Sequence, residues 1–364
     1  DLLIVFRNHE CCENSSVPLK LYAVTLRSRD GGLAWQRNES LKHVVGEEFA
    51  LHSLSDGTVL LLDAGNGTAA PVYRSDTFGH SFELSQHIPC KELGWSALED
   101  TVSPGNVYIY ADSTIYRSRN FGRTFSPLTA VSDESWHDGD TFFGQSTVFR
   151  SQSGILRHVT RVGIDIAWDQ TDGSQLWHST DATGRNWSCS TLAAGGWCGA
   201  HPCAPVQKRQ CSNSPVSFGW PGTMYNHFLR MSDGRVLNTF TQRCNGVGLQ
   251  PTANACGGNG QGDGYGTGLR GLVSYDDGAS FDFSRDYMVL HAQNDNINPL
   301  ISGKAAPGCM CGYGNTIQMA DGSLLTPYSY TNMTEAPAYD PDKAPYLPTR
   351  LGIVHWRLPN KADD

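Results

Sequence analysis

The octapeptide SRDGGLAW (residues 28–35) recurs along the chain, and its recurrence decides the expected fold. The further copies are SDTFGHSF (75–82), SRNFGRTF (118–125) and SYDDGASF (274–281), and STDATGRNW (179–187) is a copy with one inserted residue. Each eight-residue copy has Ser first, Gly fifth and an aromatic residue eighth. Gly permits a tight turn, the small polar side chains bond their own backbone, and we expect the aromatic ring to fill the core beneath. We call this octapeptide the box.

A second repeat lies between the boxes and predicts β-hairpins. LSDGTVLLL (54–62), MSDGRVLNTF (231–240) and MADGSLLTPY (319–328) each have the pattern strand, Asp-Gly turn, strand. Weaker versions surround Pro104-Gly105 and Ser153-Gly154. A third strand precedes each box, and aromatic-rich segments after the boxes supply a fourth. Four short strands per repeat are typical of a propeller blade.

Counting the repeats predicts an all-β fold, a six-bladed β-propeller of four-stranded antiparallel blades. Third strands are expected near residues 21–28, 71–75, 113–118, 174–179, 268–274 and 349–356. Blade one lacks an innermost strand and blade six an outermost strand, and both could come from residues upstream of Asp1. We expect one domain over residues 1–364, with a Cys-rich insertion at about 188–220 between blades four and five.

The composition argues against a disordered, a nucleic-acid-binding and a membrane-spanning protein. Of 364 residues, 39% are hydrophobic, which supports a sizeable core and disfavours disorder. The 27 Lys and Arg against 36 Asp and Glu leave a net charge of −9, so nucleic acid is a poor partner. No apolar run approaches the roughly 18 residues of a membrane span. The first residue is Asp rather than Met, from which we expect processing or trimming upstream.

Cysteines and glycosylation sequons together predict a secreted eukaryotic glycoprotein. There are eleven Cys, and five N-x-[ST] sequons lie at Asn14, Asn38, Asn66, Asn186 and Asn332. A thiol-rich intracellular protein is the alternative. In the insertion we expect a disulfide-stapled loop rather than a zinc site, because the potential ligands are irregularly spaced; they are Cys198, His201, Cys203 and Cys211. GGNGQGDGY (257–265) resembles one calcium-binding nonapeptide, but a single copy favours a loop. We predict no metal and no other cofactor.

The repeats also carry a resemblance to a known family. The boxes resemble the Asp-box, or bacterial-neuraminidase repeat, of sialidases and related six-bladed propellers. LRGLVSYDDGASFDF (269–283) followed by GYGNTIQMADGSLLTPYSY (312–330) is similar to the fifth-to-sixth blade pattern of that family, and VFRNHE (5–10) resembles its start. The resemblance covers essentially the whole chain. It implies blades strongly and sialidase activity weakly, because non-enzymatic propellers carry Asp-boxes too.

Topology places the candidate site on the face opposite the boxes, around the central axis. Glu48, Tyr225 and Tyr313 each lie eight residues before a hairpin Asp, so they are expected to form one layer, and Asp140 precedes the inner strand of the fourth blade. The remaining candidates lie on or near strand ends on the same face: Arg7, His9, Arg161, His227, Arg243, Arg270 and Tyr328. Forked guanidinium groups suit a carboxylate held by two hydrogen bonds, although any one Arg could instead pair with a local acid.

The resemblance suggests roles for some of these residues. Sialidases hold the substrate carboxylate with three arginines and use a Tyr nucleophile assisted by Glu, with an Asp acid/base. Tyr313 is similar to that Tyr, and Arg243 and Arg270 fall close to the second and third arginines. Arg7 resembles the first only in part. The family's Glu is replaced here by Tyr225, with His227 nearby, so Glu48 or Asp140 would handle protons.

Three functions follow from these residues. The first is an exo-acting glycoside hydrolase for a glycan that ends in an acidic sugar. The second is a propeller polysaccharide lyase, in which the arginines neutralise a uronate carboxylate and Tyr or His abstracts the adjacent proton. The third is a non-catalytic glycan-binding or structural propeller. In each case the expected partner is a glycan or polysaccharide.

Overall fold

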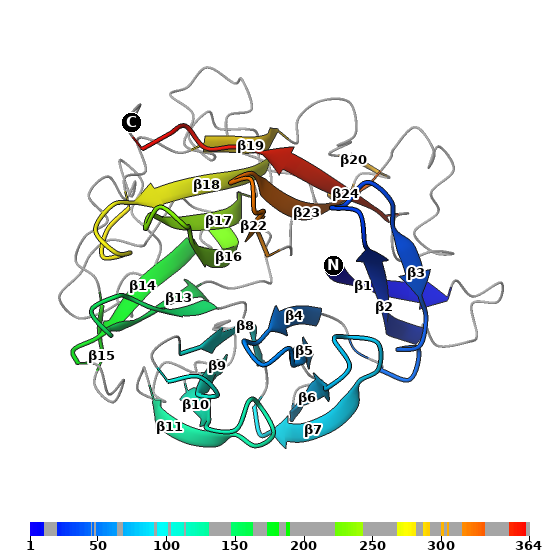
Figure 1. Ribbon diagram of the computed structural model, residues 1–364, viewed down its shortest axis with the longest axis horizontal. Coiled ribbons are helices and arrows are strands. Elements are labelled where there is room, and N and C mark those ends of the chain that lie inside the picture. The colour runs from blue at the N-terminus through cyan, green and yellow to red at the C-terminus, as the bar shows by residue number, and fades with distance from the viewer. Residues whose placement is uncertain are drawn as a thin grey trace. The chain divides into compact units, whose positions relative to one another are not determined.

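The computed structural model describes residues 1–10, 20–44, 46, 49–63, 68–90, 93–100, 103–112, 114–130, 147–162, 173–181, 187–189, 223–242, 268–281, 287–291, 300–301, 304–305, 315–331 and 349–361. Over these ranges the regular structure is β-strand throughout, as Figure 1 shows. Within the same ranges no helix is long and apolar enough to cross a bilayer. The chain divides into two compact units. One comprises Asp1–Asp133, Gly144–Arg150 and Gly184–Asn186, and the other Glu134–Phe143, Ser151–Thr183 and Trp187–Asp364.

Among its described residues, the first unit contains three antiparallel sheets whose strands follow in chain order. The first sheet has β1 (Leu2–Glu10), β2 (Lys20–Ser28) and β3 (Gln36–Asn38). The second has β4 (Phe49–Ser53), β5 (Val59–Asp63), β6 (Ala70–Ser75) and β7 (Glu83–Ile88). The third has β8 (Leu93–Glu99), β9 (Val107–Ala111), β10 (Thr114–Ser118) and β11 (Ser126–Ala130). Strand β12 (Thr147–Arg150) lies against β8, where the Val148 N–H donates to Ser96 Oγ over 3.0 Å.

The second unit has the same sequential antiparallel pairing. Strands β13 (Leu156–Val162), β14 (Gly173–Ser179) and β15 (Trp187–Cys189) are neighbours in that order. A four-stranded sheet follows, with β16 (Thr223–Arg230), β17 (Val236–Gln242), β18 (Gly268–Ser274) and β19 (Tyr287–His291). The last sheet has β22 (Ile317–Gln318), β23 (Leu324–Thr331) and β24 (Thr349–Trp356). Between these two sheets in the chain, β20 (Leu300–Ile301) pairs with β21 (Lys304–Ala305).

The strand pattern agrees with the repeat pattern of the sequence. The expected third strands coincide with β2, β6, β10, β14, β18 and β24. Within the described residues, the first sheet begins with β1 and the last sheet ends with β24. The number of blades, closure into a ring and the single-domain organisation remain predictions. Apart from Ser188 and Cys189, the insertion expected at about 188–220 lies outside the described residues.

Short, fully buried strands explain the core of each unit. All five residues of β5 (VLLLD) are buried, which is the pattern of a strand covered on both faces. In the first unit Ala23, Leu41, Val44, Val59, Leu61 and Phe82 form one apolar cluster. In the second unit Met231, Leu237, Val273 and Leu324 form another. Each cluster combines residues from neighbouring sheets of one unit, so packing between sheets forms the core.

Candidate functional site

The four boxes whose turns are described share one hydrogen-bond geometry. The first-position Ser Oγ accepts the fifth-position Gly N–H at 2.8–2.9 Å, in the pairs Ser28–Gly32, Ser75–Gly79, Ser118–Gly122 and Ser274–Gly278. The third-position side chain accepts the seventh-position N–H at 2.9–3.0 Å, in the pairs Asp30–Ala34, Thr77–Ser81, Asn120–Thr124 and Asp276–Ser280. These bonds satisfy the turn's own backbone, so the polar box residues are structural.

In three of these boxes the aromatic eighth residue is buried as expected, and in one it is not. Phe82, Phe125 and Phe281 are buried. Trp35 is only half-buried, so the prediction of burial was wrong for this copy; its Nε1–H donates to the Gly32 carbonyl 2.9 Å away within the turn itself. The side chain of Trp187 lies outside the described residues.

In three boxes the fourth residue has a positive φ, and its carbonyl accepts a hydrogen bond from a neighbouring sheet. Phe78, Phe121 and Asp277 have φ of 54°, 55° and 62°. Each of the three carbonyls accepts a guanidinium hydrogen bond from another sheet of the same unit, from Arg27 at 2.5 Å, Arg74 at 2.9 Å and Arg157 at 3.1 Å, respectively. Boxes therefore join successive sheets as well as ending strands.

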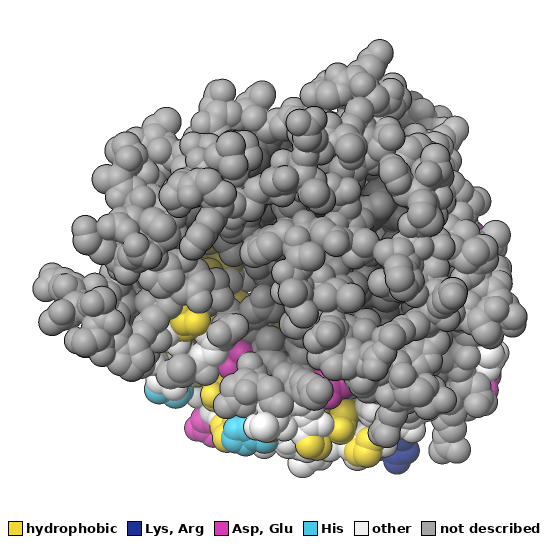
Figure 2. Space-filling model, turned by 180° about the vertical axis from the view of Figure 1, so that it is seen from behind, with side chains coloured by type: hydrophobic (Ala, Val, Ile, Leu, Met, Phe, Trp, Pro, Cys, Tyr) yellow, Lys and Arg dark blue, Asp and Glu magenta, His cyan; other side chains and the backbone are white. Residues whose placement is uncertain are grey.

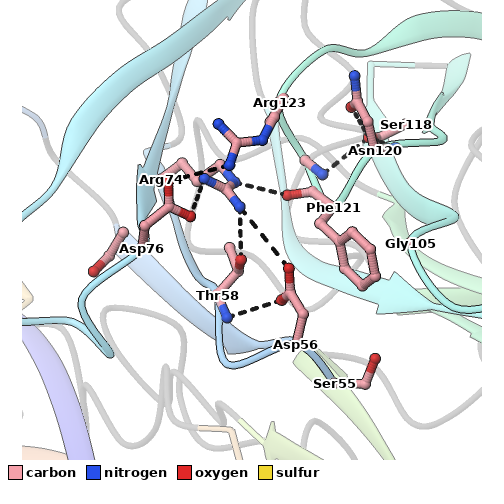
Figure 3. Close-up of polar contacts among 12 residues, drawn as sticks. Ser55, Asp56, Thr58, Arg74, Asp76, Gly105, Ser118, Asn120, Phe121 and Arg123 are labelled. Carbon is pink, nitrogen blue, oxygen red and sulfur yellow. Dashed lines mark hydrogen bonds and ion pairs between the residues drawn. The ribbon is translucent and has the colours of Figure 1, made fainter.

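Figure 3 shows the most extensive of these junctions, around Arg74 of β6. Its Nε donates to the Phe121 carbonyl, and its Nη2 donates to Thr58 Oγ1 over 2.8 Å. It also pairs with Asp76, and Nη2 lies 3.9 Å from Asp56 Oδ2. Arg74 is only 8% exposed, so its charge is neutralised where it is buried.

In the second unit, the corresponding junction is between Arg157 and the box residue Asp277. Its Oδ1 pairs with Arg230 Nη2 at 2.5 Å, and its Oδ2 accepts the Gln152 N–H at 2.6 Å. Burial lowers the pKa of the Arg157 guanidinium, while the charge of Asp277 acts in the opposite direction. Burial and the nearby charge of Arg157 lower the pKa of His178, so this imidazole is neutral at pH 7.

The predicted site residues are described to different extents. The structure describes Arg270, His227 and Tyr328 with their side chains. It describes only the backbone of Arg7, His9, Arg161 and Tyr225. Outside the described residues lie Glu48, Asp140, Arg243 and Tyr313, together with the sequons at Asn14, Asn66, Asn186 and Asn332.

Arg270 is the best-defined candidate. It lies in β18, opposite Phe240 of β17 and Met288 of β19, and it is 3% exposed. The register of β18 and β19 shifts between Leu269 and Arg270. A guanidinium is costly to bury, so a strand position of this kind needs compensating partners.

A β-bulge distinguishes the inner strand of the same sheet. The β16–β17 register shifts between Met224 and His227, so Tyr225 and Asn226 together face one residue, Phe240. His227 is opposite Thr239. Because successive strand side chains alternate, Arg270 and His227 leave opposite faces of this sheet. The sequence indicated both residues but not this separation, because the bulge is visible only from the pairing.

Tyr328 lies in β23 directly opposite Gly352 of β24. A Cβ on Gly352 would come within 2.3 Å of the Tyr328 ring carbon Cζ, so the absent side chain of Gly352 makes room for the ring. Gly352 was not among the predicted site residues, although a single Gly in the otherwise bulky strand TRLGIVHW is a signal for such a close approach.

The described residues contain no group of three or more His, Cys, Asp or Glu side chains that could hold a metal ion. Of the cysteines in the described residues, Cys90 is described with its side chain and Cys189 by its backbone. It is buried, with its Sγ 3.5 Å from the Ile88 carbonyl oxygen. Figure 2 shows that described side chains on one face are mainly hydrophobic, acidic and histidine, with little basic character. This part of the face offers no broad basic patch, in line with the net charge.

Asn38 is the sequon that the structure describes with its side chain. It ends β3, an edge strand of its sheet, and its Oδ1 accepts the Ser40 N–H over 2.9 Å. In a eukaryotic secretory host we expect a glycan on Asn38, because this strand end has room for one. Intact-mass measurement should show the loss of one glycan in both Asn38→Gln and Ser40→Ala. An unmodified Asn38 peptide beside glycosylated peptides of other sequons would contradict this prediction.

Comparison with known proteins shows a similarity of fold to a solved structure. No protein-family model matches the chain, and no curated protein matches it. A crystal structure of a protein of unknown function from Dyadobacter fermentans matches with a TM-score of 0.59 and 15% identity, covering 98% of this chain and 91% of that one. The α-L-arabinofuranosidase Arb93A of Fusarium graminearum matches with a TM-score of 0.46 and 12% identity, over 85% and 92% of the chains.

A sialidase also appears among the matches. NanB of Streptococcus pneumoniae has a TM-score of 0.35 and 11% identity, over 61% of this chain and 32% of that one. Both enzymes fall below a TM-score of 0.5, so of these three structures the Dyadobacter protein is the one that bears on the fold. That likeness covers nearly the whole of both chains and shows a shared fold alone.

Proposed function

We propose that this chain is a secreted, six-bladed, sialidase-like propeller that hydrolyses a terminal acidic sugar from a glycan. Arg270 carries the proposal. It is a buried guanidinium in β18, within the segment 269–283 that resembles the fifth blade of sialidases, close to where that family has a substrate-binding arginine. The box geometry supports the blade architecture on which the site depends.

In the proposed reaction Arg7, Arg243 and Arg270 hold the sugar carboxylate, and Tyr313 is the nucleophile. Arg forms two parallel hydrogen bonds to a carboxylate, which fixes the sugar ring as well as its charge. Glu48 and Asp140 are proposed to move the protons, one activating the Tyr313 hydroxyl and the other protonating the leaving oxygen. Arg161, His9, Tyr225, His227 and Tyr328 are proposed to contact the rest of the glycan.

The substrate test compares aryl glycosides of sialic acid and glucuronic acid with a neutral aryl galactoside. We expect the purified chain to release the aryl group from an acidic glycoside and not from the neutral one. An ultraviolet-absorbing unsaturated product from a uronate polysaccharide would identify a lyase instead. Glycan-array binding without turnover would identify a non-catalytic binder.

Arg270→Lys tests the carboxylate contact. Lysine keeps the charge but loses the guanidinium fork, so we expect Kd for the acidic sugar to rise about tenfold, or about 1.4 kcal/mol. Arg235→Lys is the matched control. Arg235 is also 3% exposed and belongs to the same sheet's hairpin, where it pairs with Asp233 at 2.8 Å. Equal weakening by both variants, measured by calorimetry, would contradict a specific role for Arg270.

A further inference from the structure

Arg157 of β13 is a buried guanidinium that forms no ion pair within the described part of the chain. The residue is 8% exposed, and its Nε donates to the Asp277 carbonyl oxygen over 3.1 Å. Among the described residues this is the hydrogen bond that its guanidinium makes, so the two Nη groups have no acceptor there. A carbonyl satisfies one donor, but it does not balance the charge of the arginine.

Two other buried arginines show the usual arrangement. Arg74 is also 8% exposed and pairs with Asp76, and Arg235 is 3% exposed and pairs with Asp233 at 2.8 Å. Burying a charge costs free energy unless an opposite charge and hydrogen bonds compensate for the lost water. Arg157 is buried to the same extent as Arg74 without such a carboxylate.

The two acids whose charges act on Arg157 make their own contacts elsewhere. Asp277 Oδ1 pairs with Arg230, and its Oδ2 accepts backbone N–H groups of the hairpin that precedes β13. Asp276 accepts the Ser280 N–H at 2.9 Å and the Ser280 hydroxyl at 2.6 Å, within its own box. Both acids favour the charged guanidinium from a distance, but neither bonds its Nη groups.

The groups around Arg157 add hydrogen-bonding capacity and positive charge. His178 of β14 is directly opposite Arg157, so the two side chains leave the same face of the sheet. The His178 Nδ1 is buried and has no hydrogen-bond partner in the described structure. The charge of Arg230 also acts on Arg157 and disfavours the charged guanidinium. The junction at the box 274–281 therefore has polar groups to spare and lacks a negative partner for Arg157.

We infer that Arg157, with His178 beside it, binds a small oxyanion such as inorganic phosphate or sulfate. The Nη groups of an arginine suit the paired oxygens of such an anion, and the anion supplies the negative charge that Arg157 lacks. None of these residues belongs to the proposed glycan site. The anion site therefore stands or falls independently of the proposed hydrolase activity.

Calorimetric titration with inorganic phosphate, at an ionic strength held constant with sodium chloride, tests the site. We expect saturable binding with a Kd in the millimolar range, roughly 1–10 mM. Arg157→Gln keeps a polar side chain but removes the charge, so Kd should rise at least about tenfold. Arg157→Lys keeps the charge but loses the paired donors, and it should raise Kd by about threefold or more.

Arg357→Gln is the matched control for loss of one positive charge in the same unit. Arg357 has a side chain that is 62% exposed and pairs with Asp321 at 2.5 Å. This variant should bind phosphate within about twofold of wild type. Circular dichroism checks that each variant is folded, and if Arg157→Gln is not, Arg157→Lys decides the comparison.

The imidazole of His178 gives a second measurement that does not depend on a variant. Burial and the charge of Arg157 lower its pKa, and an anion beside Arg157 should raise that pKa. Nuclear magnetic resonance titration with and without sulfate measures the change. Three results would each overturn the inference: no saturable phosphate binding by wild type, equal weakening by Arg157→Gln and Arg357→Gln, or a His178 pKa that sulfate leaves unchanged.

Discussion

Replacing Arg74 by Met should lower the free energy of unfolding by about 2–4 kcal/mol. The substitution removes the donor to two acceptors, Thr58 Oγ1 and the Phe121 carbonyl. An acceptor left unsatisfied inside a protein costs about 1–3 kcal/mol. Asp76 is 55% exposed and can be solvated by water, so its lost ion pair adds little. Urea unfolding followed by circular dichroism measures the change.

Arg123→Met is the matched control for this prediction. Arg123 also pairs with Asp76, at 3.3 Å, but its side chain is 60% exposed. An exposed ion pair contributes little, so this variant should stay within about 0.5 kcal/mol of wild type. If the two methionine variants unfold at the same urea concentration, the bond between β6 and the next box contributes nothing measurable to stability.

The box and hairpin repeats could be predicted from sequence because their bonds are local. In the box at Ser118, for example, every defining hydrogen bond joins residues two to four positions apart. An eight-residue pattern contains all the information for such a turn. Five of the six third strands could be located for the same reason, because each of β2, β6, β10, β14 and β18 ends at the first Ser of a box.

The contacts between sheets could not be predicted in this way. Arg74 and Phe121 are 47 positions apart, and Arg157 and Asp277 are 120 positions apart. Nothing in the spacing of these residues identifies the fourth-position carbonyl as the acceptor. That role depends on a positive φ at Phe121 and Asp277, a conformation that non-glycine residues seldom adopt.

The candidate site was predictable in its residue types rather than in its geometry. The sequence indicated Arg270 as a ligand-binding arginine, and the structure shows that it is buried in β18. The sequence grouped Arg270 with His227, but a bulge at Tyr225 and Asn226 sets the pairing that puts them on opposite faces of the sheet. The hydrogen bonds that join Thr316 Oγ1 to Thr239 and Thr326 were not predicted, because isolated Thr residues are ordinary and only the pairing of sheets brings these three together.

Acid should destabilise the second unit through His158. This residue lies in β13, opposite Trp177, and is fully buried. Burial lowers its pKa from 6.5 to about 3. The unfolded chain therefore binds a proton at a pH where the folded protein does not. As pH falls below 6.5, this difference favours the unfolded state until pH reaches about 3. The loss should be about 2 kcal/mol at pH 5 and about 3 kcal/mol at pH 4.

His158→Gln isolates this contribution, because the amide does not titrate in this range. Between pH 7 and pH 5 the wild-type free energy of unfolding should fall by about 2 kcal/mol more than that of His158→Gln. The control is His80→Gln, since His80 is exposed on a box turn. If the free energy of unfolding of wild type and of His158→Gln changes equally with pH, then His158 is protonated in the folded protein as easily as in the unfolded chain. In that case water or an acidic partner reaches an imidazole that the packing of β13 and β14 is expected to keep dry.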